Sequence, residues 1–158
     1  MWLPDETFKS IIQHTPLISI DLIVRNEKGE VLLGKRLNAP AKGYWFVPGG
    51  RVRKNETLDD AFIRLVREEL DIESGVTRAD AKFLGIFEHF YKDCVFGGDV
   101  STHYIVLVYE FTLEKVNEIK KRNQHSKFNY FNVNDISSKK DIHELTKHYF
   151  ILDKFKKS

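Results

Sequence analysis

The chain has 158 residues, of which 42% are hydrophobic and 13% aromatic, which suffices for one domain with a substantial core but not for two ordinary domains. Its 25 Lys and Arg residues against 23 Asp and Glu leave a net charge of +2, so no global field argues for nucleic acid or an acidic membrane surface as partner. The single cysteine, Cys94, excludes an intrachain disulfide and a multi-cysteine metal site. We therefore expect one domain over residues 1–158 in the cytoplasm, without an export or membrane-spanning segment.

The first third of the chain predicts a helix, a hairpin and a short strand. The helix spans residues 5–13, the two strands of the hairpin span 17–24 and 31–35, and the short strand spans 44–47. Pro48, Gly49 and Gly50 follow the apolar run 44–47, and the two glycines allow the backbone to turn sharply. Such a turn exposes a carbonyl oxygen, a hard ligand of the kind that Mg2+ prefers.

A helix over 58–70 comes next, with Thr57 and Asp60 as a capping box at its start. Its apolar stripe consists of Leu58, Ala61, Phe62, Leu65, Val66 and Leu70. Glu69 projects into that stripe, where a carboxylate stays ionised only if a cation or several donors meet it. Arg64 and Glu68 share one flank, and taken alone they are no more than a surface ion pair on an ordinary amphipathic helix. A carbonyl and a carboxylate that converge, however, predict a Mg2+ site for a diphosphate.

The rest of the chain predicts strands, a polar stretch and a closing helix. The strands span residues 83–91, 103–111 and 128–133, the polar stretch 114–126, and the helix 141–156. Hairpins combined with crossovers predict an α+β layer sandwich.

Residues 49–72 resemble the Nudix box, a loop-helix-loop that combines a Mg2+ site with a nucleoside-diphosphate site. The matching positions are Gly50, Glu56, Arg64, Val66, Glu68, Glu69 and Ile72. Two positions depart from the box, since Leu65 replaces a Glu and Asp71 replaces a Gly. The resemblance implies a Nudix-type α/β/α sandwich with a mixed β-sheet. Asp71 tolerates the left-handed conformation less well than Gly, so we expect an altered helix end that affects local geometry rather than chemistry.

Beyond the box, most of the chain is similar to the GDP-mannose mannosyl hydrolases, a Nudix branch that also lacks the carboxylate at the position of Leu65. The similar segments are residues 15–21, 33–36, 43–52, 88–91, 102–104 and 124–125. This resemblance implies hydrolysis of GDP-mannose to GDP and the free sugar, by attack of water at the anomeric carbon with inversion. GDP-glucose stays open as a second substrate, and a homodimer is implied.

The same resemblance implies the site residues. One Mg2+ per subunit, replaceable by Mn2+, is held by the Gly50 carbonyl and the side chains of Glu69 and Gln124. His125 is the expected base, because its ordinary pKa lies near neutrality. The remaining catalytic or substrate-binding residues are Arg36, Arg51 and Arg64 at the diphosphate, Tyr104 at the leaving group, and Asp21 and His89 around the sugar.

Each of these assignments has an ordinary alternative. His125 and Gln124 can be a solvated pair, Asp21 can satisfy a structural hydrogen bond, and His89 and Tyr104 can be core residues. Two other functions also stay open, a conventional Nudix pyrophosphohydrolase and a non-catalytic module that binds a nucleotide sugar. Leu65 argues against the first, and a base at His125 argues against the second.

Overall fold

The computed structural model describes residues 2–72, 76–113 and 125–151, without the side chains of residues 125 and 126. Within this part of the chain, seven strands form one mixed sheet with the order β3-β2-β1-β6-β5, while β4 pairs with β1 and β7 pairs with β2. Their bounds are β1 Leu17–Arg25, β2 Val31–Arg36, β3 Trp45–Phe46, β4 Gly49–Arg51, β5 Lys82–Tyr91, β6 Thr102–Thr112 and β7 His125–Phe131. Strands β1 and β6 are parallel, and the other pairs are antiparallel.

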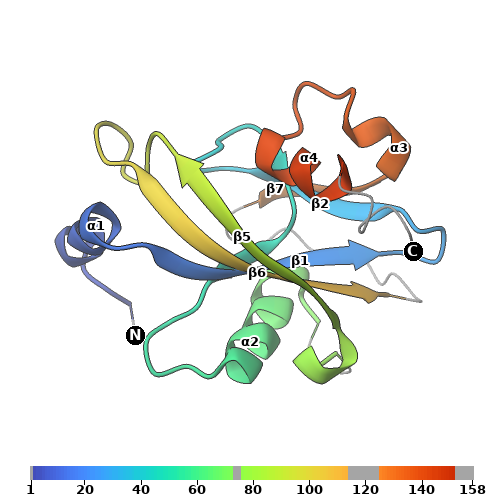
Figure 1. The fold of residues 1–158 in the computed structure, drawn as a ribbon, viewed down its shortest axis with the longest axis horizontal. Helices are drawn as coiled ribbons and strands as arrows, with labels where there is room; N and C mark the ends of the chain where they lie inside the picture. Colours follow the sequence, from blue (N-terminus) through green and yellow to red (C-terminus); the bar gives the residue numbers. More distant parts are fainter. Residues whose placement is uncertain (1, 73–75, 114–124, 152–158) are drawn as a thin grey trace.

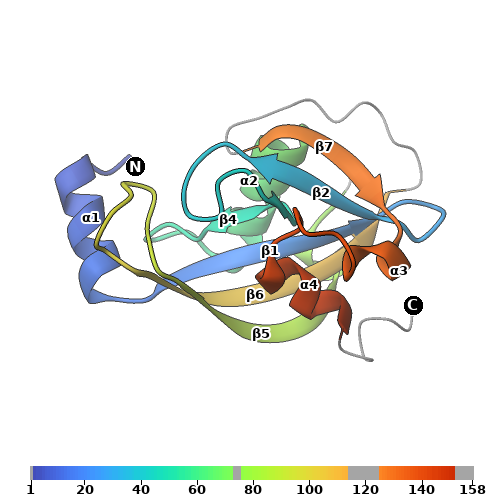
Figure 2. The same ribbon diagram turned by 90° about the horizontal axis from the view of Figure 1, so that it is seen from above.

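Helices cover both faces of the sheet (Figure 1). Helix α2 (Leu58–Leu70) packs on one face, and α3 (Val133–Ile136) and α4 (Glu144–Ile151) lie on the other. Helix α1 (Asp5–His14) lies at one end of the sheet, far from α3 and α4 (Figure 2). The arrangement confirms the predicted Nudix-type α/β/α sandwich with a mixed sheet. No helix in residues 2–72, 76–113 and 125–151 is long and apolar enough to span a membrane.

Strand β1 is buried along almost its whole length because both faces of the sheet are covered. Its alternating side chains supply two cores. Ile20, Leu22 and Val24 pack with the apolar stripe of α2. Ile23 faces the opposite side and packs with a cluster that includes Tyr149 of α4. This geometry makes β1 the central element from which site residues can project.

The predicted helices and strands are largely confirmed, with shifted ends. The last strand ends at Phe131 because Asn132 caps α3, its Oδ1 accepting from the Asn134 N–H at 2.9 Å. Helix α4 begins at Glu144 rather than at residue 141. The short helices Arg78–Asp80 and α3 were not predicted. Most of the polar stretch 114–126 lies outside the described residues.

The predicted turn at Gly49 and Gly50 is wrong. Both residues belong to β4, which pairs antiparallel with β1. The glycines are required here for close approach rather than for a turn. A Cβ at Gly49 would collide with the carbonyl oxygen of Ile20, and a Cβ at Gly50 would lie 2.6 Å from Cδ2 of Leu65. The two glycines therefore let β4 lie tightly between β1 and α2.

Candidate active site

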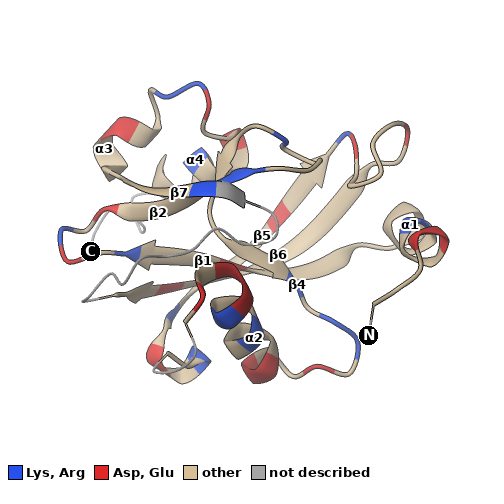
Figure 3. Ribbon diagram, turned by 180° about the vertical axis from the view of Figure 1, so that it is seen from behind, with Lys and Arg blue, Asp and Glu red and all other residues tan. Residues whose placement is uncertain are grey.

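One cavity of about 670 Å³ brings together eight of the ten predicted site residues. They are Asp21, Arg36, Gly50, Arg51, Arg64, Glu69, His89 and Tyr104. They come from β1, β2, β4, α2, β5 and β6, so the sheet and its box helix together form the cavity wall. Both signs of charge lie along α2 and along the segment that leads from β4 into it (Figure 3).

Helix α2 places a buried carboxylate on the cavity wall. The Thr57 hydroxyl caps the helix by accepting from the Asp60 N–H at 3.1 Å. This bond confirms the Thr57 side of the predicted capping box. The helical repeat then puts Leu65 and Glu69 on the buried face, each 2% exposed. Burial raises the pKa of Glu69 to about 7, opposed by the charge of Arg36. A cation in the cavity would favour the ionised form of Glu69.

Leu65 closes over Gly50 at the point where the box usually carries a carboxylate. The close approach of Leu65 Cδ2 to Gly50 leaves no room for a side chain at residue 50. Both residues line the cavity beside Glu69. The wall is therefore apolar at a position where the Nudix box would add a negative charge.

Arg64 is held by four hydrogen bonds and is only 11% exposed. Its Nε and Nη2 donate to the two carboxylate oxygens of Glu56 at 2.6 and 3.0 Å, and its Nη1 donates to Glu68 at 3.1 Å. Its Nη2 also donates to the carbonyl of Arg51 at 2.8 Å. These bonds lower the pKa of Glu56. Arg64 thus braces the segment that presents Arg51, while its predicted contact with a diphosphate stays a prediction.

A buried hydrogen-bonded chain joins Asp21, Tyr149 and His89. The Tyr149 hydroxyl donates to Asp21 Oδ2 at 2.6 Å and lies 3.1 Å from His89 Nε2. Since that hydroxyl has one proton, it accepts from His89, which places the imidazole proton on Nε2. Burial raises the pKa of Asp21 to about 7, partly offset by the bond from Tyr149, and burial lowers the pKa of His89 to about 4. His89 is therefore neutral at neutral pH.

Tyr149 was missed in the sequence. It stands in the closing helix directly before the apolar residues Phe150 and Ile151, as a core aromatic would, and it is 128 positions from its partner Asp21. Only the packing of α4 against the sheet brings the two together.

Arg36, Arg51 and Tyr104 line the same cavity. Arg36 Nε donates to the carbonyl of Pro40 at 2.8 Å, which holds the guanidinium beside the loop that contains Pro40. The Arg51 guanidinium lies over the ring of Phe8, 4.8 Å from its centroid. Burial raises the pKa of Tyr104, opposed by both arginines, so its hydroxyl is protonated at neutral pH. Cations and a hydroxyl donor thus face the same space, which suits a diphosphate.

His125 begins β7, and its backbone pairs with that of Arg36 in β2. The sheet register therefore brings residue 125 next to a residue that lines the cavity. The side chain of His125 and the whole of Gln124 lie outside the described part of the chain, so their roles stay predictions.

No cluster of three or more His, Cys, Asp or Glu side chains suited to a metal occurs among the described residues. The cavity wall nevertheless carries the buried carboxylate of Glu69, the carboxylate of Glu68 and the backbone of Gly50. This small set of protein oxygens fits Mg2+, because that ion keeps water and phosphate oxygens in its other coordination positions.

Comparison with known proteins shows the family of the chain. The NUDIX domain model matches residues 15–152. The low-salt glycan biosynthesis protein Agl8 of Haloferax volcanii is 44% identical over 129 residues, which are 82% of this chain and 79% of that protein. The ADP-ribose pyrophosphatase of Methanocaldococcus jannaschii is 33% identical over 72 residues, which are 46% of this chain and 40% of that protein.

Solved structures share the fold. The MutT protein from Methanosarcina mazei Go1 superposes with a TM-score of 0.68 at 24% identity, covering 87% of this chain and 93% of that one. The NUDIX domain of Shewanella oneidensis NrtR, crystallised with ADP ribose, gives a TM-score of 0.63 at 15% identity, covering 98% of this chain and 97% of that one. At these identities the likeness concerns the fold alone.

Proposed function

Because this chain belongs to the NUDIX domain family of hydrolases, we propose that it is a GDP-mannose mannosyl hydrolase. In this reaction, water attacks the anomeric carbon of mannose, the bond from that carbon to the β-phosphate oxygen breaks, and GDP leaves. Attack from the face opposite the leaving group inverts the anomer. GDP-glucose, which differs in the orientation of one hydroxyl, is the second substrate to test.

Leu65 is the observation that carries this proposal. Attack on phosphorus in an ordinary Nudix site relies on several box carboxylates to hold metals and activate water. At one of these carboxylate positions this chain carries Leu65, whose apolar side chain is 2% exposed and packs on Gly50. The burden of activating water then moves away from the box, and we assign it to His125.

The sugar end of the cavity supports the same proposal. Asp21 and His89 are fixed in a buried chain through Tyr149, and both line the cavity. Carboxylate and imidazole groups that are held in place can bind sugar hydroxyls with defined geometry. The similarity to a protein named for glycan biosynthesis fits a nucleotide-sugar substrate.

The other residues take the roles that the resemblance to the mannosyl hydrolases implies. Arg36, Arg51 and Arg64 contact the diphosphate, and Tyr104 donates to the oxygen that leaves. The carbonyl of Gly50 and the side chains of Glu69 and Gln124 would hold one Mg2+ per subunit, with Mn2+ as a substitute. When bound, the cation would stabilise the charge that develops on GDP. A homodimer and a cytoplasmic setting complete the proposal.

An isotope experiment tests the bond that breaks. The protein is incubated with GDP-mannose and Mg2+ in 18O-labelled water. The products are then separated, and mass spectrometry shows which of them carries the label. Label in mannose with unlabelled GDP is expected. Label in a phosphate would refute attack at carbon and identify a pyrophosphohydrolase, to which Glu68 could contribute as a second-metal ligand. No turnover would instead favour a different substrate or a binding module.

A matched pair of variants tests the base. His125→Gln should lower kcat by about 100-fold or more, the range that a positioned general base contributes. His14→Gln is the control, since His14 is exposed on α1 and does not line the cavity. Full turnover in His125→Gln would refute the role of His125.

A further inference from the structure

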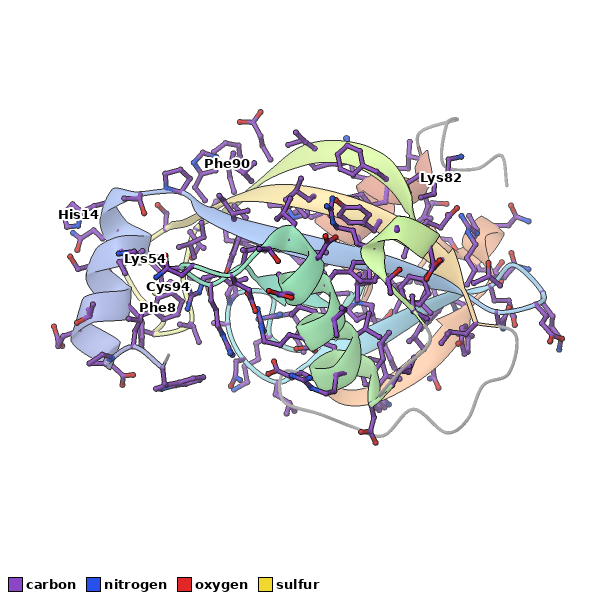
Figure 4. The ribbon with its side chains drawn as sticks, turned by 90° about the horizontal axis from the view of Figure 1, so that it is seen from below. Phe8, His14, Lys54, Lys82, Phe90 and Cys94 are labelled. Carbon is purple, nitrogen blue, oxygen red and sulfur yellow. The ribbon has the colours of Figure 1, made fainter. Side chains whose placement is uncertain are left out.

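The cavity extends beyond the proposed catalytic residues to a second wall near α1. This aromatic end consists of Trp2, Asp5 and Phe8 from the segment that includes α1, with Val95 and Phe96 from the loop between β5 and β6. The rings of Phe8 and Phe96 meet edge to face, with centroids 6.1 Å apart. In Figure 4, Phe8 lies on the side of α1 that faces Cys94, whereas His14 points away.

Arg51 joins the aromatic end to the diphosphate part of the cavity. Its guanidinium lies 4.8 Å from the centroid of Phe8, while its backbone is braced by Arg64. In a nucleoside diphosphate, only the ribose separates the base from the α-phosphate. A diphosphate bound by Arg51 would therefore place its base at the aromatic end.

We propose that the aromatic end binds the nucleobase of the substrate and that Asp5 selects guanine. This inference rests on the proposed function in one respect, that the ligand is a nucleoside diphosphate derivative. Trp2 is 87% exposed and Phe96 is 37% exposed, so their rings have surface free for stacking with a base. Stacking on aromatic rings tolerates any base, so it supplies affinity rather than selectivity.

Asp5 supplies the selectivity. It is exposed at the start of α1, and it lines the cavity. A carboxylate accepts hydrogen bonds only. Guanine presents two neighbouring donors, its N1–H and its exocyclic amine, and both can bond to one carboxylate. Adenine presents an acceptor at N1, which a carboxylate repels. The aromatic end therefore fits guanine and disfavours adenine.

Calorimetric titration with the α,β-methylene analogues of GDP and ADP tests this inference, because neither analogue can be cleaved between its phosphates. The wild-type protein should bind the guanine analogue at least tenfold more tightly. Asp5→Asn should bring that ratio close to one. Its control is Glu6→Gln, which removes the same charge from the same helical turn but does not line the cavity, and it should retain the ratio.

A second pair of variants tests stacking. Phe96→Ala should weaken both analogues by about tenfold, as expected for the loss of a base-stacking ring. Its control, Phe90→Ala, removes an exposed phenylalanine of β5 that lies outside the cavity, and it should change neither affinity. The inference is overturned if Asp5→Asn keeps the wild-type ratio or if Phe96→Ala binds both analogues like the wild type.

These outcomes separate the inference from the proposed function. Guanine selectivity that depends on Asp5, in a protein that does not release mannose from GDP-mannose, would support the base site and refute the proposed reaction. Mannose release with no effect of Asp5→Asn on base selectivity would support the proposed reaction and refute the base site.

Discussion

Asp21 should make the metal-free protein less stable as the pH rises, and Asp21→Asn should remove that loss. The carboxyl is 7% exposed, and burial raises its pKa from 3.8 to about 7. Between these two values the folded protein keeps a proton that the unfolded chain has lost. The stability linked to this group is therefore fully present below pH 3.8 and is lost as the pH rises through about 7.

The magnitude follows from the two pKa values. A rise from 3.8 to about 7 corresponds to about 4 kcal/mol of unfolding free energy once the pH exceeds both values. Roughly 2 kcal/mol of this loss falls between about pH 5.5 and about pH 8. Glu69, whose pKa is also raised to about 7, adds a loss of the same sign. That second loss is common to the wild type and the variant, so it cancels in their difference.

Urea denaturation of both proteins in EDTA, at about pH 5.5 and about pH 8, measures the effect. The unfolding free energy of Asp21→Asn relative to the wild type should grow by about 2 kcal/mol between the two conditions. Asp99→Asn, at an exposed residue, should follow the wild type at both. Parallel pH dependence of the wild type and Asp21→Asn would refute the assignment of a buried, destabilised carboxylate at residue 21.

Three further substitutions have expected outcomes. Tyr149→Phe removes the bond to Asp21 and should lower the unfolding free energy by about 2 kcal/mol near pH 8, and by less near pH 5.5, in urea denaturation. It should also raise KM for GDP-mannose while leaving GDP affinity unchanged, and equal losses for both ligands would contradict a role at the sugar. Glu56→Gln weakens the brace on Arg64 and should cost about 1–3 kcal/mol in the same assay, with a fall in kcat/KM. Asp71→Gly should raise the melting temperature, with about 0.5–1 kcal/mol gained at the left-handed helix end, and should leave activity intact; lost activity in the folded variant would contradict it.

The sequence predicted the box helix well because local rules govern it. The helix bounds, the cap at Thr57 and the burial of Glu69 follow from the helical repeat and from capping chemistry. Asp71 adopts φ 59° and ψ 37° at the helix end, so it takes the left-handed conformation that the box Gly would otherwise supply.

What the sequence could not predict depends on contacts between distant segments. The pairing of Gly49 with Asp21 makes β4 a strand rather than a turn, and the glycine pair alone is compatible with either. Tyr149 reaches Asp21 only through the packing of α4 on the sheet. The local pattern around each of these residues gives no sign of its partner.

Under the proposed function, the two buried carboxylates, Asp21 and Glu69, predict that the cation and the substrate bind cooperatively. Each has a pKa near 7, and Arg36 opposes the rise at both. A diphosphate that enters this cavity alone meets carboxylates that resist ionisation and would repel it once ionised. A cation at Glu69 would favour its ionised form and attract the diphosphate. By linkage, the substrate must then raise cation affinity by the same factor as the cation raises substrate affinity. Because Leu65 leaves one fewer carboxylate to hold such a cation, the proposed site should depend more on this coupling than a site with the full set of box carboxylates.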